Sequence, residues 1–372
     1  MAKRILITGG AGFIGSHLAD ELLEHGHQVR ILDRLSAQVH ANGKERPVYL
    51  SRDVEPIWGD LRNRETVQRA VRDMDAVYHF AAAVGVGQSM YAIEDYTSHN
   101  DLGTAVLLEA LIKRPVERLV VASSMSVYGE GLYRSGTQVI SSGVERSVIQ
   151  LRAGLWEPAD KDGSPLEPIA TPESKPPALS SVYALSKYVQ ERMCLMIGRA
   201  YDIPTVALRF FNVYGPRQSL SNPYTGVLAI FASRYLNGKP PVIFEDGWQR
   251  RDFVSVHDVA HACRLCLDAA DAVDKVLNIG SGHACTIRGL AGLMARALGC
   301  ESIAPIINGK YRVGDIRHCF ADISRARAFI GFNPQVTLDH GIVELADWLG
   351  DQQAEDHFDR AAEELTTRGL TL

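Results

Sequence analysis

The chain has 372 residues, of which 46% are hydrophobic and 22% charged, and its formal net charge at pH 7 is −5. This balance gives no basic surface for a nucleic acid or an anionic membrane, and no apolar run approaches the roughly 18 residues of a membrane-spanning helix. The length suffices for more than one domain or lobe. The first strand begins within four residues, so we expect no signal peptide, and six scattered cysteines favour the cytoplasm.

The first predicted unit is a strand, a glycine-rich turn and a helix. Residues 5–7 are a short apolar run typical of a buried parallel strand, and residues 14–22 carry apolar side chains at helical spacing. Between them, three glycines stand where a dinucleotide-binding turn requires them: Gly9, Gly12 and Gly15. The first permits a tight bend, the second lets backbone approach a pyrophosphate, and the third allows close helix packing. The helix N-terminus would bind the phosphates.

An acidic residue strengthens this prediction. The next predicted strand, residues 28–32, ends at Asp33, which follows Gly9 by 24 positions and Gly15 by 18. A carboxylate near this spacing accepts hydrogen bonds from the adenosine ribose and repels a 2′-phosphate, which favours NAD over NADP. Arg34 keeps NADP as an alternative, and a surface aspartate is the other interpretation. Turn, helix and acid together predict an NAD site.

Strands and helices alternate along most of the chain. Further buried strands are predicted over residues 75–80, 118–122, 205–211 and 275–279. Helices are predicted over residues 64–74, 100–113, 181–201, 226–237, 256–270, 287–298, 323–330 and 338–349. This alternation predicts an α/β fold with a Rossmann-type, doubly wound parallel sheet.

The alternation breaks at residues 131–177, a Ser-, Gly- and Pro-rich insertion that contains no cysteine or histidine and therefore no metal knuckle. We expect residues 1–212, including this insertion, to form the NAD-binding domain. Residues 213–350 predict mainly a smaller, mixed α/β substrate-binding lobe, with some segments returning to the first domain. The acidic segment 351–372 is expected to be a peripheral tail.

A Cys263-x-x-Cys266 motif near His257 and His261 raises a metal site as an alternative. On the predicted helix, at about 100° per residue, the cysteines and the histidines lie on opposite faces and cannot converge on one ion. Packed thiols are the better interpretation, and we expect no metal.

Three polar residues suit proton transfer from a carbinol. Tyr183 and Lys187 lie four positions apart on one predicted helix face, and Ser124 follows the strand 118–122. Tyrosine, with a pKa near about 10, is a poor base at neutral pH, and a nearby ammonium lowers that pKa. Ser124 could hydrogen-bond the same substrate oxygen. An ordinary amphipathic helix face is the alternative, and the preceding NAD motif makes the catalytic interpretation the better one.

Residues 3–350 resemble the extended short-chain dehydrogenase/reductases that act on nucleotide sugars. The motifs that carry the resemblance are Thr8-Gly9-Gly10-Ala11-Gly12-Phe13-Ile14-Gly15, Gly59-Asp60-Leu61-Arg62, Ser123-Ser124 through Gly129, Tyr183-x-x-x-Lys187, Asn212 through Arg217, and Arg251-Asp252-Phe253. The resemblance implies a catalytic role for Ser124, Tyr183 and Lys187, with NAD as cofactor and a nucleotide-diphosphate sugar as substrate. It also implies a homodimer formed by the helices 100–113 and 181–201.

The same resemblance implies two sets of binding residues. The expected cofactor contacts are Gly9, Gly12, Phe13, Ile14, Gly15, Asp33, Arg34, Asp60, Leu61, Phe80, Ala81, Ala82, Asn100, Ser123, Tyr183 and Lys187. The expected substrate contacts are Ser126, Asn212, Arg217, Arg251 and Arg312. Asn212 would contact a substrate phosphate, and Arg251 and Arg312 would hold the diphosphate through their charged forks. Without the resemblance, both arginines would be interpreted as solvated surface charges.

A departure from the family pattern bears on the reaction. Members that eliminate water usually carry an acidic pair, or a glutamate two positions on, after the catalytic Ser or Thr; here Met125 and Ser126 stand there, and neither exchanges a proton near pH 7. An epimerase needs no such acid: Tyr183 would take the 4-OH proton while C4 gives hydride to NAD+, and the 4-keto sugar would turn over before hydride returns. A 4,6-dehydratase, a net 4-keto reductase and a non-catalytic NAD sensor or scaffold are the alternatives.

The insertion bears on the sugar. Ser124 and Tyr183 are 59 positions apart, more than in compact epimerases of the family. Three motifs are similar to a bacterial subgroup that includes dTDP-L-rhamnose 4-epimerases: Tyr133-Arg134, Trp156-Glu157-Pro158 and Thr171-Pro172-Glu173. Those relatives often carry cysteines here, and this chain does not. We expect a dTDP-L-rhamnose 4-epimerase, with UDP-glucose and UDP-glucuronate 4-epimerases as alternatives. The other interpretation of the insertion is a lid or a dimer-contact loop that has no bearing on which sugar is bound.

Overall fold

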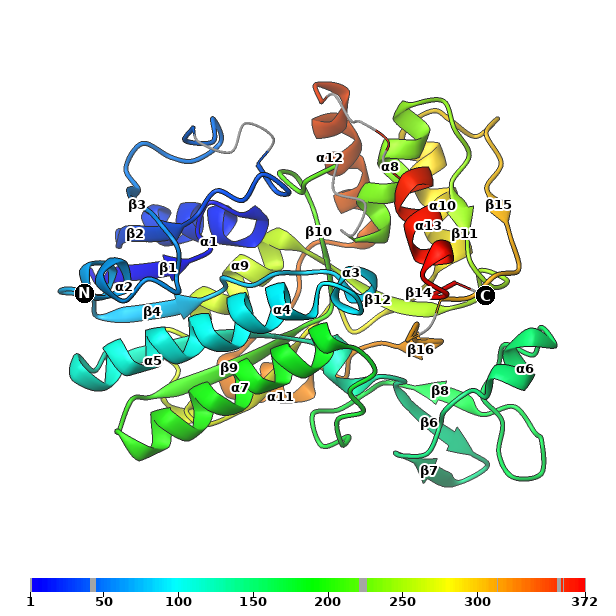
Figure 1. The fold of residues 1–372 in the computed structure, drawn as a ribbon, viewed down its shortest axis with the longest axis horizontal. Coiled ribbons are helices and arrows are strands. Elements are labelled where there is room, and N and C mark those ends of the chain that lie inside the picture. Colours follow the sequence, from blue (N-terminus) through cyan, green and yellow to red (C-terminus); the bar gives the residue numbers. More distant parts are fainter. Residues whose placement is uncertain are drawn as a thin grey trace.

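The computed structural model describes residues 2–40, 45–220, 226–312, 314–352, 356 and 358–371. Its centre is a seven-stranded parallel sheet in the order β13-β9-β5-β4-β1-β2-β3 (Figure 1). The strands are β1 (Arg4–Thr8), β2 (Gln28–Asp33), β3 (Glu55–Trp58), β4 (Ala76–His79), β5 (Arg118–Ser124), β9 (Thr205–Phe210) and β13 (Val276–Ile279). The strand order reverses between β1 and β4, where open α/β sheets bind their ligands. The predicted Rossmann-type fold is confirmed.

Helices cover both faces of this sheet and enclose two apolar cores. The helices of one face are α1 (Phe13–Glu24), α9 (Val256–Leu265) and α11 (Ser324–Ile330). Those of the other face are α2 (Arg64–Ala70), α5 (Gly103–Lys113) and α7 (Val182–Ala200). Before α5 lie the short helices α3 (Val86–Ser89) and α4 (Ile93–Tyr96) and a π-helical turn, Thr97–Leu102. Cys263 and Cys266 are fully buried in the first core, as packed thiols.

The second lobe is smaller and mixed. Its helices are α8 (Val227–Leu236), α10 (Ile287–Ala297) and α12 (Leu338–Gly350), which share one apolar core. Its strands are β10 (Asn212–Tyr214), β12 (Arg250–Ser255), β14 (Ala284–Thr286) and β16 (His318–Cys319) in one sheet, and the pair β11 (Val242–Ile243) and β15 (Ile306–Ile307). From residues 213–350, α9, β13 and α11 lie on the large sheet of the first domain.

The insertion 131–177 forms a separate small sheet at the lower right of Figure 1. Its elements are β6 (Leu132–Ser135), β7 (Gln138–Ile140), α6 (Val148–Arg152) and β8 (Glu167–Ile169), and β6 is the central strand. Its last residues return to the first domain, where the buried Lys175 Nζ donates to the Tyr128 carbonyl oxygen at 2.8 Å. Tyr128 closes the turn that follows Ser124, so the insertion contacts the backbone next to a predicted catalytic residue.

The C-terminal segment forms the helix α13 (Phe358–Thr367), red in Figure 1. Arg234 of α8 pairs with Asp359 at 2.7 Å, and the Arg368 guanidinium lies 4.2 Å from the ring centroid of Tyr91, which follows α3. The described part of this segment therefore contacts both lobes; residues 353–355, 357 and 372 of the predicted tail lie outside the described residues. Among the helices of the described ranges, none combines the length and apolarity needed to cross a membrane.

Candidate active site

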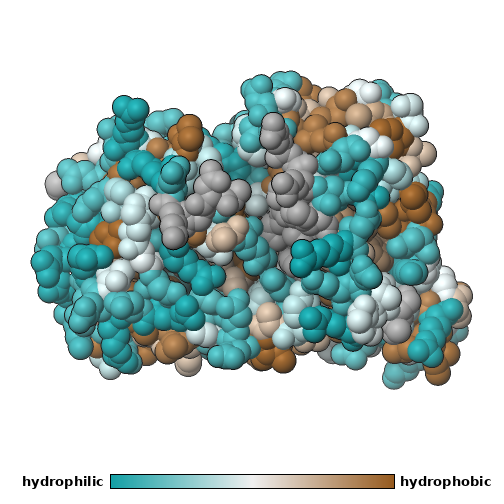
Figure 2. All heavy atoms as spheres, turned by 45° about the horizontal axis from the view of Figure 1, so that its top comes forward, coloured by the Kyte–Doolittle hydropathy of each residue, from teal (hydrophilic) through white to brown (hydrophobic). Residues whose placement is uncertain are grey.

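A cavity of about 530 Å³ runs along the C-terminal ends of the central strands. Residues of the glycine-rich turn line one end, and Tyr183, Asn212 and Phe253 line the other, so both lobes contribute to it. Figure 2 shows the surface indented between the two lobes. The cavity lies at the switch point of the sheet, where parallel strands leave room for a ligand.

The glycine turn fits a pyrophosphate. Gly9 has a φ of +72°, in the left-handed region, and a Cβ on Gly15 would lie only 2.4 Å from the Gly9 carbonyl oxygen. Neither position accepts a side chain without moving backbone. The Asp33 carboxylate lines the cavity beyond the turn and accepts the N–H groups of Ala11 at 3.0 Å and Leu35 at 2.9 Å. The turn and the fixed carboxylate fit NAD.

Most predicted cofactor contacts line this cavity. They are Gly9, Gly12, Phe13, Ile14, Gly15, Asp33, Arg34, Asp60, Leu61, Phe80, Ala81, Ala82, Ser123, Tyr183 and Lys187. Asn100 is not among the described lining residues: its buried carboxamide accepts the Ala83 N–H at 2.7 Å and donates to the Ser186 hydroxyl at 2.8 Å. It shapes the loop after β4, because a buried amide must satisfy its own hydrogen bonds.

Asp60 is held by its own motif. Arg62 donates to both carboxylate oxygens, at 2.9 and 2.7 Å, and this hydrogen bonding lowers the pKa of Asp60 to about 2. The carboxylate is therefore ionised at neutral pH. Nearby, Arg34 contacts the ring of His99, which pairs with Asp95 at 3.0 Å. The charged groups at the cofactor end thus already have partners.

The predicted catalytic residues come together. Ser181 caps α7 by accepting the Ala184 N–H at 3.1 Å, and the helix then places Tyr183 and Lys187 in the cavity lining. Ser124 reaches them from the end of β5 and hydrogen-bonds with Tyr183. Burial raises the pKa of Tyr183, and the hydrogen bond with Ser124 lowers it in part.

The Lys187 ammonium is hydrogen-bonded to a residue outside the described cavity lining. Burial lowers the pKa of Lys187 to about 8, and its Nζ donates to the Gln190 side-chain oxygen at 2.7 Å. Gln190 in turn donates to the Thr104 hydroxyl at 2.9 Å, and it contacts the His79 ring at 3.2 Å. Gln190 was not among the residues predicted from the sequence. The feature that could have indicated its contact with Lys187 is its position three residues later on the same helix.

Ser126 lies beside the predicted catalytic serine, Ser124. Its hydroxyl donates to the Ser124 Oγ at 2.9 Å, and both side chains line the cavity with Met125. Among the described residues of the lining, the acids are Asp33, Asp60 and Asp95. None of these follows β5, so this end of the described cavity offers no carboxyl group for elimination chemistry.

The predicted substrate residues divide into two groups. Asn212 lines the cavity, and its buried carboxamide oxygen has no hydrogen-bond partner among the described residues, which leaves it available to a ligand. Arg217, Arg251 and Arg312 lie outside the described lining. Arg217 pairs instead with Asp20 of α1 at 2.7 Å.

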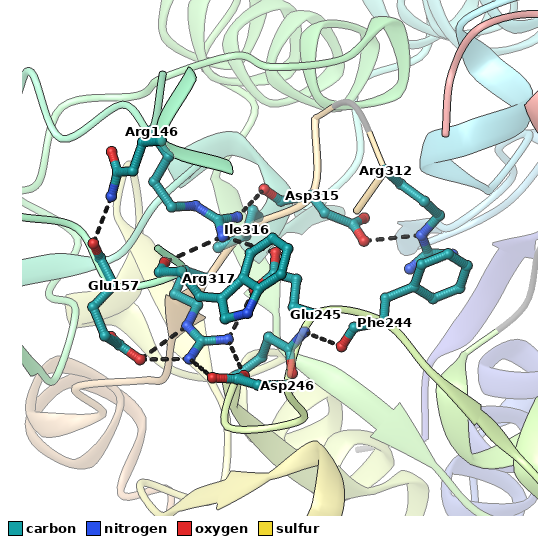
Figure 3. Close-up of polar contacts among 12 residues, drawn as sticks. Arg146, Glu157, Phe244, Glu245, Asp246, Arg312, Asp315, Ile316 and Arg317 are labelled. Atoms are coloured by element: carbon teal, nitrogen blue, oxygen red, sulfur yellow. Dashed lines mark hydrogen bonds and ion pairs between the residues drawn. The ribbon is translucent and has the colours of Figure 1, made fainter. Parts of the chain in front are cut away.

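Arg251 and Arg312 both contact the segment 315–317. Arg251 donates to the carbonyl oxygen of Arg317 at 2.9 Å and to that of Ile316. Arg312 donates to the Asp315 carboxylate at 2.8 Å (Figure 3), and its backbone pairs with that of Thr371.

Comparison with known proteins places these features in a family. Residues 5–280 match the model of the NAD dependent epimerase/dehydratase family. The dTDP-L-rhamnose 4-epimerase of Burkholderia thailandensis is 35% identical over 354 residues, which cover 94% of this chain and 96% of that protein. A putative UDP-glucose 4-epimerase of Methanocaldococcus jannaschii is 32% identical, with 93% of this chain and 98% of that protein covered.

Solved structures of epimerases are similar to this chain over nearly its whole length. The UDP-glucose 4-epimerase of Thermotoga maritima with UDP-glucose has a TM-score of 0.75 at 30% identity, covering 93% of this chain and 98% of that one. A mutant of the UDP-glucuronic acid 4-epimerase of Bacillus cereus, in complex with UDP-4-deoxy-4-fluoro-glucuronic acid and NAD, has a TM-score of 0.76 at 28% identity, covering 93% and 99%. The predicted resemblance, an enzyme of the isomerase class and NAD as cofactor are confirmed. The chain belongs to the NAD-dependent epimerase/dehydratase family of extended short-chain dehydrogenase/reductases.

Proposed function

We propose that the protein is a nucleotide-diphosphate-sugar 4-epimerase that works through a transient 4-keto sugar, with dTDP-L-rhamnose as its substrate. The observation that carries the reaction type is the contact between Tyr183 and Ser124 in a cavity whose other end fits NAD. A phenol and a hydroxyl on one substrate oxygen are suited to moving one proton as a carbinol becomes a ketone.

The side chains of this chain would act as follows. Tyr183, as phenolate, accepts the proton of the sugar 4-OH, and Ser124 hydrogen-bonds the same oxygen while its charge changes. Burial raises the pKa of Tyr183, and the hydrogen bond with Ser124 lowers it in part. We expect the Lys187 ammonium, one helical turn away, to favour the phenolate further. NAD, when bound, supplies the acceptor and donor of the C4 hydride. Tyr183 then returns the proton to the ketone oxygen, so no second acid is required.

The absence of a described carboxyl group beside Ser124 supports epimerisation over 4,6-elimination. Elimination removes a proton at C5 and protonates the leaving hydroxyl at C6, and both steps need acid–base groups at that end of the sugar. In the described lining, that end carries Met125 and Ser126. Near pH 7 the Ser126 hydroxyl serves neither as the base at C5 nor as the acid at C6, and Met125 has no acidic proton.

The choice of sugar is supported by the 35% identical relative and by the character of the lining. Beyond the cofactor end, the described lining includes the apolar side chains of Val84, Val86, Met125 and Leu228, and Lys187 is its one cation. The C6 methyl group of a 6-deoxy sugar can pack against such apolar side chains, whereas a buried uronate carboxylate is best paired with a cation of its own. UDP-glucose is the second candidate, because the Thermotoga relative carries it in its crystal structure.

We also propose a homodimer in the cytoplasm. The segments 100–113 and 181–201 expose Leu102, Leu185 and Met196 by about half of their surface (51%, 48% and 52%). Exposed apolar side chains on neighbouring helices suit a symmetric helix–helix interface. All six cysteines are free, which suits a reducing compartment.

The test is product analysis by NMR in D2O with dTDP-L-rhamnose, UDP-glucose and UDP-glucuronate. We expect inversion at C4 of dTDP-L-rhamnose without incorporation of solvent deuterium. Deuterium at C5 or C6 would show elimination chemistry, and stoichiometric use of added NADH would show a reductase. Binding of NAD without turnover of any of these sugars would favour the non-catalytic sensor.

A variant pair tests the base. Tyr183→Phe should lower turnover by about 10²- to 10⁴-fold while bound NAD stays unchanged, because only the proton acceptor is lost. Tyr188→Phe, on the same helix but outside the described lining, should leave turnover unchanged. Near-normal turnover of Tyr183→Phe would overturn the assignment.

A further inference from the structure

A buried ion cluster joins the insertion 131–177 to the segment that carries Arg312 (Figure 3). At its centre, the side chain of Arg317 is fully buried. Its guanidinium donates to Glu245 at 2.8 Å, to Asp246 at 2.6 Å and, through Nε, to Glu157 at 3.1 Å. Glu157 belongs to the insertion, and the other two acids to the turn after β11.

A second arginine extends the cluster. Arg146, from the insertion, is 5% exposed, and it donates to Glu245 at 2.7 Å and to the Asp315 carbonyl oxygen at 3.1 Å. The Glu245 side chain, 2% exposed, is therefore shared by Arg146 and Arg317. The insertion thus contacts residues 315–318 both directly and through this shared carboxylate.

The backbone held by this cluster also holds the two arginines expected at the diphosphate. Arg251 binds the carbonyl oxygens of Ile316 and Arg317, and Arg312 pairs with Asp315. None of residues 131–177 is among the described residues that line the cavity. Any effect of the insertion on the substrate must therefore pass through the parts that it holds.

A contrast within the insertion shows that this contact is specific. Arg134 and Glu167 also pair, at 2.7 Å, but both side chains are largely exposed, 43% and 59%. Such a pair is screened by solvent and fixes little. The cluster differs at its centre, where Arg317, Arg146 and Glu245 are at most 5% exposed, while Glu157 at its edge is 40% exposed. Displacing a member leaves one of these buried charges without a partner, so the cluster holds one arrangement of the backbone.

We propose that the insertion is a positioning element for the substrate diphosphate, and that Arg146 and Glu157 are its positioning residues. They fix the backbone of residues 315–318, which sets the direction from which Arg251 and Arg312 approach the phosphates. A guanidinium fork binds a phosphate in a restricted geometry, so a shift of its support costs binding. The inference rests on the proposed function, in which a nucleoside diphosphate occupies this site.

The first experiment separates binding from chemistry. Glu157→Gln keeps the size of the side chain and removes its charge; Glu167→Gln is the matched control in the exposed pair. NAD-loaded enzyme is titrated with dTDP and with UDP by calorimetry, and kcat and KM are measured with dTDP-L-rhamnose. We expect Glu157→Gln to weaken nucleotide binding and raise KM by about tenfold with kcat within about twofold, and Glu167→Gln to change neither.

A merely structural role gives a different result. It would reduce the folded, active fraction and leave the Kd and KM of that fraction unchanged, which would overturn the proposal. Arg146→Lys keeps a cation in the cluster and serves as the milder variant. It should raise KM by about threefold, because an ammonium cannot reproduce the forked contacts of a guanidinium.

A double-variant cycle tests the route. If Glu157 acts through Arg251 and Arg312, the tenfold effect of Glu157→Gln on dTDP binding should shrink to about threefold in an Arg251→Met background. An unchanged factor would overturn the proposal. Wild-type enzyme that binds neither dTDP nor UDP would overturn the proposed function as well, whereas wild-type binding with no response to Glu157→Gln overturns this inference alone.

Discussion

The cofactor wall of the cavity and the arginine-bearing segment that lies outside its described lining are built in different ways. Asp33 is fixed by the N–H groups of Ala11 and Leu35, 22 and two positions away. On the other side, Arg251 binds Arg317 across 66 positions, and Arg317 binds Glu157 across 160. The cofactor wall therefore depends on contacts within its local strand–turn–helix unit and the neighbouring strand. The arginine-bearing segment depends on contacts between distant parts of the chain, one of which is the insertion.

The largest effect is expected from a change that removes the cofactor wall alone. In Gly15→Val, the new Cβ would meet the Gly9 oxygen at 2.4 Å and the Gly10 Cα at 2.7 Å, both backbone atoms, so the turn must open. The purified variant should retain no NAD, as measured by chromatography of the extracted cofactor, and should still bind dTDP by calorimetry. Gly350→Ala, where an added Cβ meets open space, is the control. Loss of dTDP binding together with NAD would show that the cofactor wall and the arginine-bearing segment are not independent.

A smaller effect is expected from breaking the long-range assembly. Arg317→Met leaves Glu157, Glu245 and Asp246 without their central cation and should lower the free energy of unfolding by about 3–5 kcal/mol. The same change in the exposed pair, Arg134→Met, should cost at most about 1 kcal/mol. Urea unfolding of the two NAD-saturated variants measures the difference. Equal costs would contradict the contrast between buried and exposed pairs.

The smallest effect is a pH dependence of the same assembly. Burial raises the pKa of Glu157, but hydrogen bonds from His318 and Arg317 outweigh it, and the pKa falls from 4.5 to about 2. Between these values the unfolded chain binds a proton that the folded chain does not, so stability falls as the pH is lowered. The free energy of unfolding should decline more steeply between about pH 5 and about pH 3 in wild type than in Glu157→Gln, by a modest amount because Glu157 is 40% exposed. Equal slopes would contradict this assignment.

The features that depend on short-range spacing were predictable. The helix predicted over 181–201 is Val182–Ala200, and its spacing correctly places Tyr183 and Lys187 on one face, opposite Ser124 at a strand end. The positions of helix ends were predicted less accurately. The helix predicted over 64–74 ends at Ala70, before Asp73 takes a φ of +60°, and a single sequence gives no signal for that turn.

The features that depend on long-range packing were not predictable. Arg317 lies between Ile316 and His318, and an isolated arginine has the sequence signal of a solvated side chain; it is nevertheless fully buried, because acids 71 and 160 positions away surround it. Asn100 was expected in the cavity lining, and it lies one layer behind. A helical position fixes the direction of a side chain, but the loop that covers it is fixed only by the tertiary fold.

The contacts of the C-terminal segment have a practical consequence. Thr371 pairs with the backbone of Arg312, and Arg368 covers Tyr91, so the last described residues lie beside the segment that would receive the diphosphate. An affinity tag appended there would crowd the segment that carries Arg312, and we expect it to alter measured Michaelis constants. A tag placed before Lys3 would extend from the N-terminal edge of β1, at the opposite end of the strands from the cavity, and is the better choice for enzymology.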